Sequence, residues 1–232
     1  LAACAPPEAA VGVAQAPLRP DSPNNREAFR FDPSDTVEAF DSPGGSFKIW
    51  FTRTGPNAVP GGEVEGVPEK VLTVAQRYDE VARFYEDELG FEPPLADDIV
   101  DGANGGDARF DVYLVDFGGV GDGRYTREAC LRDAPSRCAG YMAQENDFRG
   151  YSYPSLDYAV RILASHEYFH AVQAAYDADQ GSVLAEGTAV WATEQYDPSL
   201  SDFEGFIDGY LDNPDRPIDE PLPGPVDAFS YG

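Results

Sequence analysis

The chain has 232 residues, 42% of them hydrophobic, which is long enough for one large domain and excludes disorder of the whole chain. Its 42 acidic and 16 basic residues give a net charge of −26, so nucleic acids and anionic membranes are expected not to be partners. A salty habitat or bound Ca²⁺ would suit this charge, although a solvated acidic surface is the simpler explanation.

The first residues suggest an exported protein. Leu1-Ala2-Ala3-Cys4 resembles a bacterial lipobox, in which the cysteine is lipidated after signal cleavage, although such a tetrapeptide also arises by chance. Residues 5–25 are rich in Pro and Ala without periodicity, which predicts a tether. We therefore expect a cell-envelope or extracellular lipoprotein, anchored at Cys4, with a single domain over residues 26–232. The signal peptide would begin before Leu1, and the Pro-rich end suggests that further sequence follows.

The first half of this domain shows the patterns of strands and of one amphipathic helix. The aromatic and β-branched run 46–53 is bounded by Gly and Pro, which predicts a strand. Apolar residues then recur at intervals of three and four over residues 69–89, which predicts an amphipathic helix ended by Gly90. Two further strands are predicted over residues 109–117 and 139–145.

The segment between these two strands contains a Gly-rich stretch and two cysteines, and no strand is predicted in it. Residues 118–123 lack the following helix and the Lys-Ser/Thr end that a phosphate-binding loop needs. Cys130 and Cys138 enclose the seven polar residues 131–137, which predicts a disulfide-closed loop formed in an oxidising compartment. Zinc binding by this pair is less favoured, because no further Cys or His accompanies it.

The second half of the domain is expected to be mainly helical. A long helix is predicted over residues 155–176, with Ser155 as its start signal. A second helix is predicted over residues 183–196, stopped by Pro198, and a third over residues 202–211. The predicted fold class is therefore α+β.

The first of these helices carries His166-Glu167-Tyr168-Phe169-His170, the pattern H-E-x-x-H, which uses the only two histidines of the chain. On a helix the two imidazoles lie about 40° apart on one face, where they can share a tetrahedral Zn²⁺. Glu167 lies about 100° from His166, where it can act as a general base without binding the metal. The alternative is two ordinary histidines bonded to backbone carbonyls.

A catalytic zinc site needs a third protein ligand and an open position. The chain has no third histidine, so we expect a carboxylate. The extended pattern H-E-x-x-H-x-x-G-x-x-H fails, because Gln173 and Tyr176 occupy its Gly and His positions. Glu186 is the preferred third ligand, at the start of the next predicted helix. Glu194 is the reserve, and the other acids are less favoured.

This arrangement resembles the gluzincins, metallopeptidases with H-E-x-x-H on one helix and a glutamate ligand on the next. More narrowly, residues 166–173 (His-Glu-Tyr-Phe-His-Ala-Val-Gln) and 186–191 (Glu-Gly-Thr-Ala-Val-Trp) are similar to exported bacterial metalloproteases of the myxobacterial type. Weaker likeness extends to residues 111–116 and 140–147. The resemblance covers roughly residues 46–232 and implies a zincin-like fold, with an N-terminal mixed sheet, a backing helix and a mainly helical second half.

The resemblance implies a zinc-dependent peptidase, expected to be an endopeptidase, that cleaves proteins or peptides outside the cytoplasm. Zn²⁺ bound by His166, His170 and Glu186 would activate a water molecule, and Glu167 would take up its proton. A different hypothesis is a surface lipoprotein that keeps the zincin fold as a metal-binding or protein-binding module without turnover. A latent zymogen is a third hypothesis.

The developing oxyanion usually has a second donor besides the metal. Because no further histidine exists, a tyrosine hydroxyl is the expected donor. Tyr231 is the preferred candidate, and Tyr196 and Tyr210 are alternatives. The strand at 139–145 is a candidate for pairing with an extended substrate by edge addition.

Overall fold

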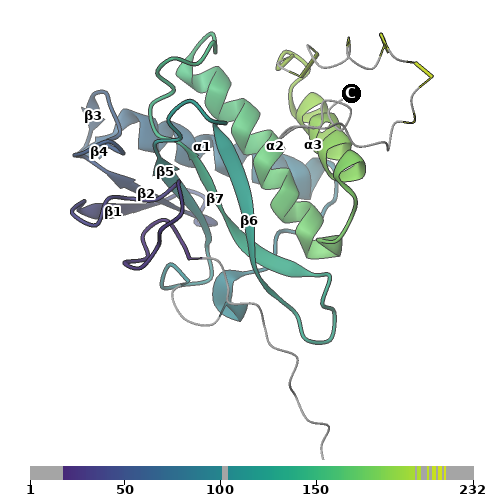
Figure 1. Cartoon of the computed structure of the whole chain (residues 1–232), viewed down its shortest axis with the longest axis horizontal. Helices are drawn as coiled ribbons and strands as arrows, with labels where there is room; N and C mark the ends of the chain where they lie inside the picture. The colour runs from purple at the N-terminus through teal and green to yellow at the C-terminus, as the bar shows by residue number, and fades with distance from the viewer. Residues whose placement is uncertain are drawn as a thin grey trace, which may run out of the picture.

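The computed structural model describes residues 18–100 and 104–201, together with residues 203, 204, 208, 211, 212, 214, 215 and 217. In this part of the chain, a five-stranded mixed sheet packs with three α-helices (Figure 1). The strand order is β1-β2-β5-β7-β6, and β3 and β4 form a separate two-stranded sheet. The α+β class and the mixed sheet expected from the sequence are therefore confirmed.

The large sheet contains β1 (Val37–Asp41), β2 (Phe47–Thr52), β5 (Phe110–Val115), β6 (Gly123–Cys130) and β7 (Cys138–Glu145), and the small sheet contains β3 (Glu63–Val64) and β4 (Val67–Pro68). Strands β2, β5 and β7 are parallel, whereas β1 and β6 pair antiparallel at the two edges. The three strands predicted from the sequence are β2, β5 and β7. The two edge strands were not predicted.

The helices agree with the predicted ones. They are α1 (Glu69–Arg83), which continues into a π-helical turn (Phe84–Glu88), then α2 (Leu156–Asp177) and α3 (Ser182–Tyr196). The Ser155 hydroxyl caps α2 by accepting a hydrogen bond from the Tyr158 N–H at 3.1 Å. Part of the helix expected over 202–211 lies outside the described residues. No helix in the described ranges is long and apolar enough to cross a membrane.

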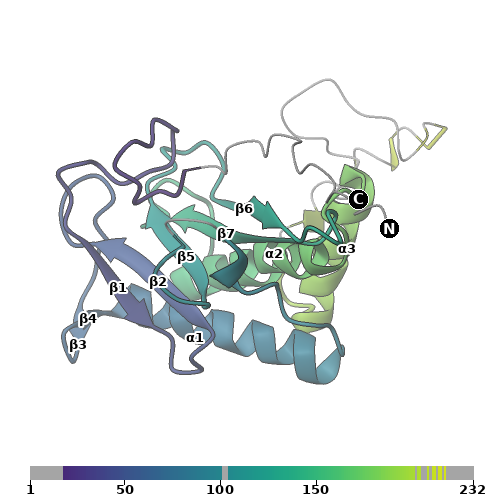
Figure 2. The ribbon, with the colours of Figure 1, turned by 90° about the horizontal axis from the view of Figure 1, so that it is seen from below.

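The sheet has a different cover on each face. Helices α1 and α2 pack against each other on one face, while the N-terminal segment lies over the other (Figure 2). Alternate residues of β5 therefore serve two cores, because side chains of a strand point to opposite faces. Val112 and Leu114 join the core under the helices, whereas Tyr113 and Val115 pack with Phe31 of the N-terminal segment. This double burial explains why β5 lacks exposed residues.

The N-terminal segment is part of the folded domain in its described portion. Arg19, expected to lie in the tether, is only 2% exposed, and its guanidinium contacts the side-chain carboxyl groups of Asp97, Asp111 and Glu128. One buried cation thus lies among three carboxyl groups, and burial of an ionised carboxylate without it would be costly. Residues 18–25 consequently pack on the sheet, unlike the tether expected there.

Candidate metal centre

The H-E-x-x-H motif lies on α2, the most enclosed of the three described α-helices. Helix α2 contacts β6 and β7 on one side and α1 and α3 on others. Small and apolar residues such as Ala159 and Ala164 line its contact faces, which lets neighbouring elements approach closely. His166, in the middle of this helix, is 3% exposed. The motif therefore occupies the interior of the helical layer beside the sheet.

Helix α3 brings Glu186 to the two histidines. The Glu186 Oε2 atom lies 3.0 Å from His166 Nε2 and 3.4 Å from His170 Nε2. The donor atoms of all three residues lie within 4.8 Å of one another. Donors at the corners of a zinc tetrahedron with bonds of about 2.0–2.2 Å are roughly 3.3–3.6 Å apart. The donor set, two nitrogens and one oxygen, therefore fits a zinc ion, and the described residues contain no second group of this kind.

Charge within this group favours a cation. Burial lowers the pKa of His170, but the hydrogen bond to Glu186 and the negative charge of Glu167 outweigh it and raise the pKa to about 9. Burial acts to raise the pKa of Glu186, but the hydrogen bonds with both histidines hold it well below its usual value. The carboxylate is thus ionised and faces a protonated imidazole. A metal ion at this position would replace that proton.

Glu167 lies beside the three-residue group and outside it. It lines a cavity of about 420 Å³ together with His170, Glu186 and residues of β6. Its Oε2 atom accepts a hydrogen bond from the Tyr125 backbone N–H at 3.1 Å. Gly123 makes room for it, because a Cβ at that position would lie 3.1 Å from Glu167 Cγ. The edge strand therefore holds the carboxylate at the wall of the cavity.

The edge strand beside this cavity is β6. The strand at 139–145, the candidate for edge addition, has no free edge, because it is β7 and lies between β5 and β6. The sequence signals for β6 are weak: Tyr125 and Thr126 are β-formers, but the strand also carries Arg124 and Arg127 and is half-exposed along its length. Hydrophobic alternation therefore could not reveal it.

No family model matches this sequence, and no curated protein has significant similarity to it. The likeness to gluzincins therefore rests on the motif residues alone. Any proposal about function therefore depends on the geometry of the site.

The remaining candidates from the sequence do not join the site or are not described. Glu194 lies on α3 outside the three-residue group. The Tyr196 hydroxyl donates to Glu80 of α1 at 3.5 Å, and its ring packs edge-on against Phe84. Tyr210, Tyr231 and Cys4 lie outside the described residues.

Two contacts of the histidines were missed by sequence reasoning. The ring of Phe203 stacks on His166 with centroids 4.7 Å apart. The Gln173 Oε1 atom lies 2.8 Å from His170 Nδ1. Gln173 had been noted only as a departure from the extended motif, although its spacing of three residues from His170 places it on the same side of the helix.

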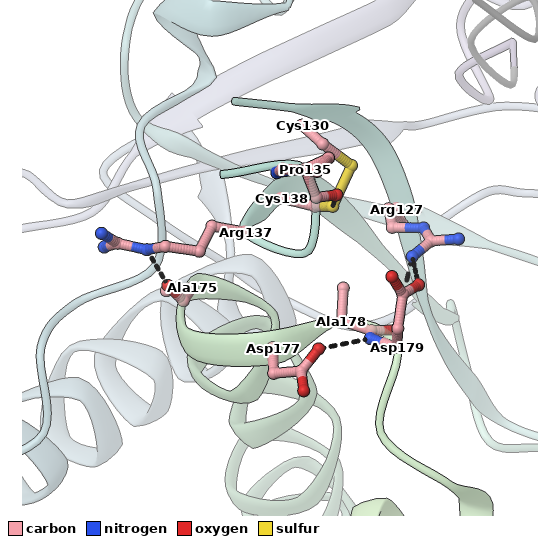
Figure 3. The surroundings of a disulfide bond; sticks show 9 residues. All are labelled: Arg127, Cys130, Pro135, Arg137, Cys138, Ala175, Asp177, Ala178 and Asp179. Atoms are coloured by element: carbon pink, nitrogen blue, oxygen red, sulfur yellow. Dashed lines mark hydrogen bonds and ion pairs between the residues drawn. A yellow bond between two sulfur atoms is a disulfide. The ribbon is translucent and has the colours of Figure 1, made fainter. Parts of the chain in front are cut away.

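The predicted disulfide anchors the far end of the motif helix. Cys130 and Cys138 are bonded and join the ends of β6 and β7, as expected from the sequence. Figure 3 shows the loop between them lying against the end of α2, where the Arg137 Nε atom donates to the Ala175 carbonyl at 2.5 Å. The bridge thus joins β6 to β7, and the loop that it closes contacts the end of α2.

Proposed function

We propose that the protein is a zinc-dependent peptidase on a zincin-like fold. The observation that carries the proposal is the single Glu186 oxygen that faces both imidazoles, with Glu167 at the wall of the adjoining cavity. Structural zinc sites are closed by four protein ligands, whereas catalytic ones have three and an open position. Three ligand residues and a carboxylate beside a cavity favour the catalytic type.

His166, His170 and Glu186 would hold the ion. When bound, zinc would lower the pKa of water at its open position and polarise a substrate carbonyl. Glu167 would accept a proton from the attacking water and return it to the leaving amine. The Tyr125 N–H steadies this carboxylate through one oxygen. The protein would thus hold the base, Glu167, in a fixed position next to the ion.

We propose extended polypeptides as the substrates. Strand β6 pairs only with β7 among the described strands, and residues Gly123 to Tyr125 line the cavity. A peptide that adds to this edge by backbone hydrogen bonds would run beside Glu167. The disulfide between Cys130 and Cys138 supports a proposal about where the protein acts, because such bonds persist in oxidising compartments. We therefore propose action outside the cytoplasm, with the anchor at Cys4 as part of that proposal.

The substitution Glu167→Gln tests the role of the base. Glutamine has nearly the same shape but does not accept the proton, so casein cleavage should fall by about 10²–10⁴-fold while the zinc content stays unchanged. Glu194→Gln is the matched control on α3 and should cleave at the parental rate. Parental activity in Glu167→Gln would reject the assigned base. A zinc-loaded parent that cleaves neither casein nor a peptide library would favour a binding module without turnover.

A further inference from the structure

We propose that Gln173 is the positioning residue of the metal centre: its side-chain amide orients His170 so that Nε2 faces the ion, and it ties this ligand to the helix that carries Glu186. The inference rests on the proposed zinc site and concerns how that site is held. No motif assigns this role to Gln173.

The direction of each hydrogen bond follows from the partners of the Gln173 amide. Its Nε2 atom donates to the Ala185 carbonyl at 2.7 Å and to the Thr188 hydroxyl oxygen at 2.8 Å. A carbonyl oxygen only accepts, so the amide nitrogen has to face Ala185 and the amide oxygen has to face His170. His170 Nδ1 lies 2.8 Å from that oxygen and therefore carries the hydrogen.

This orientation selects the nitrogen that is offered to the metal. With Nδ1 bonded to Gln173, the other ring nitrogen of His170 is the one that lies 3.4 Å from Glu186 Oε2. Histidine ligands commonly donate their second ring N–H to a neighbouring acceptor, which sets the ring orientation. Gln173 is 8% exposed, so little water competes for the bond.

The same amide also connects the two ligand-bearing helices. Ala185 directly precedes Glu186, and Thr188 lies two residues beyond it. The Thr188 hydroxyl donates to the Leu184 carbonyl at 2.7 Å, which leaves its oxygen ready to accept from Gln173. One side chain of α2 thus joins His170 to the turn of α3 that carries Glu186, which contributes to the stability of the helix pair.

Two substitutions separate positioning from helix docking. Gln173→Glu keeps an acceptor for the His170 Nδ1–H but has no N–H for the Ala185 carbonyl. Gln173→Leu loses both bonds. Asn57→Leu is the control, because Asn57 is also buried and its amide donates to the Arg30 carbonyl at 3.2 Å and accepts from the Asp116 N–H at 2.8 Å, and neither partner lines the cavity.

The first measurement is the zinc dissociation constant of each full-length variant, by competition with a chelator. Gln173→Leu should bind zinc about 10–100-fold more weakly than the parent, the usual cost of losing such a partner. Gln173→Glu, which keeps the acceptor for His170, and Asn57→Leu should stay close to the parental affinity, although both lose thermal stability. If Gln173→Glu and Gln173→Leu lost zinc affinity equally, Gln173 would only hold the two helices together and would not orient His170. Parental affinity in Gln173→Leu would overturn the inference.

The second measurement does not need the metal. Because the chain has only two histidines, ¹⁵N-histidine labelling gives NMR signals from two imidazoles. The His170 Nδ1–H should exchange slowly with water and be visible in the metal-free parent and in Gln173→Glu, and be lost in Gln173→Leu. A visible signal in Gln173→Leu, or none in the parent, would contradict the inference. A parent that shows this signal but binds no zinc would refute the proposed function alone.

Discussion

Gly123→Ala tests whether the edge strand sets the position of the proposed base. The glycine backbone is not in the left-handed region, so alanine is tolerated conformationally and the effect is steric. Its Cβ would lie 2.9 Å from both Met142 Cε and Leu163 Cδ2, and 3.1 Å from Glu167 Cγ. Overpacking of this kind costs about 1–3 kcal/mol, because side chains leave their preferred rotamers. For a domain of this size, that lowers Tm by about 2–12 °C.

The displaced Glu167 should also slow the reaction. A misplacement approaching 1 Å costs on the order of a hundredfold in rate, so we expect casein cleavage to fall by about 10- to 100-fold at unchanged zinc content. Gly181→Ala is the matched control, since a Cβ there has no atom within 4 Å. Thermal unfolding, zinc content and cleavage are measured on all three proteins. Parental Tm together with parental cleavage in Gly123→Ala would refute the reasoning.

Two further predictions concern stability. Burial raises the pKa of Asp97 to about 8, so the folded state keeps a proton that the unfolded chain releases near 3.8, and stability should fall as pH rises from about 4 to about 8. Asp97→Asn should flatten this part of the pH profile in urea denaturation, and an unchanged slope would reject the buried proton. Replacing Cys130 and Cys138 by serine should lower the free energy of unfolding by about 2–3 kcal/mol, because the bridge closes a short loop in the unfolded chain. Unchanged urea stability under oxidising conditions would contradict this.

The candidate metal centre is the part of the molecule that the sequence predicts best. Helical periodicity alone sets the angles between His166, Glu167 and His170. The scarcity of histidine then leaves a carboxylate as third ligand, and Glu186 stands at the start of the next helix. The structure brings His166, His170 and Glu186 together, and the helix limits agree because caps and stop residues are local signals.

The missed features depend on partners far away in the chain. Arg19 stands in a Pro- and Ala-rich stretch, but its carboxylate partners are 78 to 109 residues away. Strand β6 is recognisable only through its pairing with β7 and its packing against α2. The amide of Gln173 gains its role from Ala185 and Thr188 on another helix. Local pattern carries no information about such contacts until the elements are packed.

The most direct test of the proposed ligand set is the zinc content of three purified proteins: the parent, His166→Ala and Glu186→Ala. Elemental analysis should find one zinc per chain in the parent and almost none in either variant, because each loses one of three donors. Circular dichroism checks that the variants remain folded. Parental zinc content in a folded Glu186→Ala would place the third ligand elsewhere, and a zinc-free parent after incubation with zinc would contradict the metal centre itself.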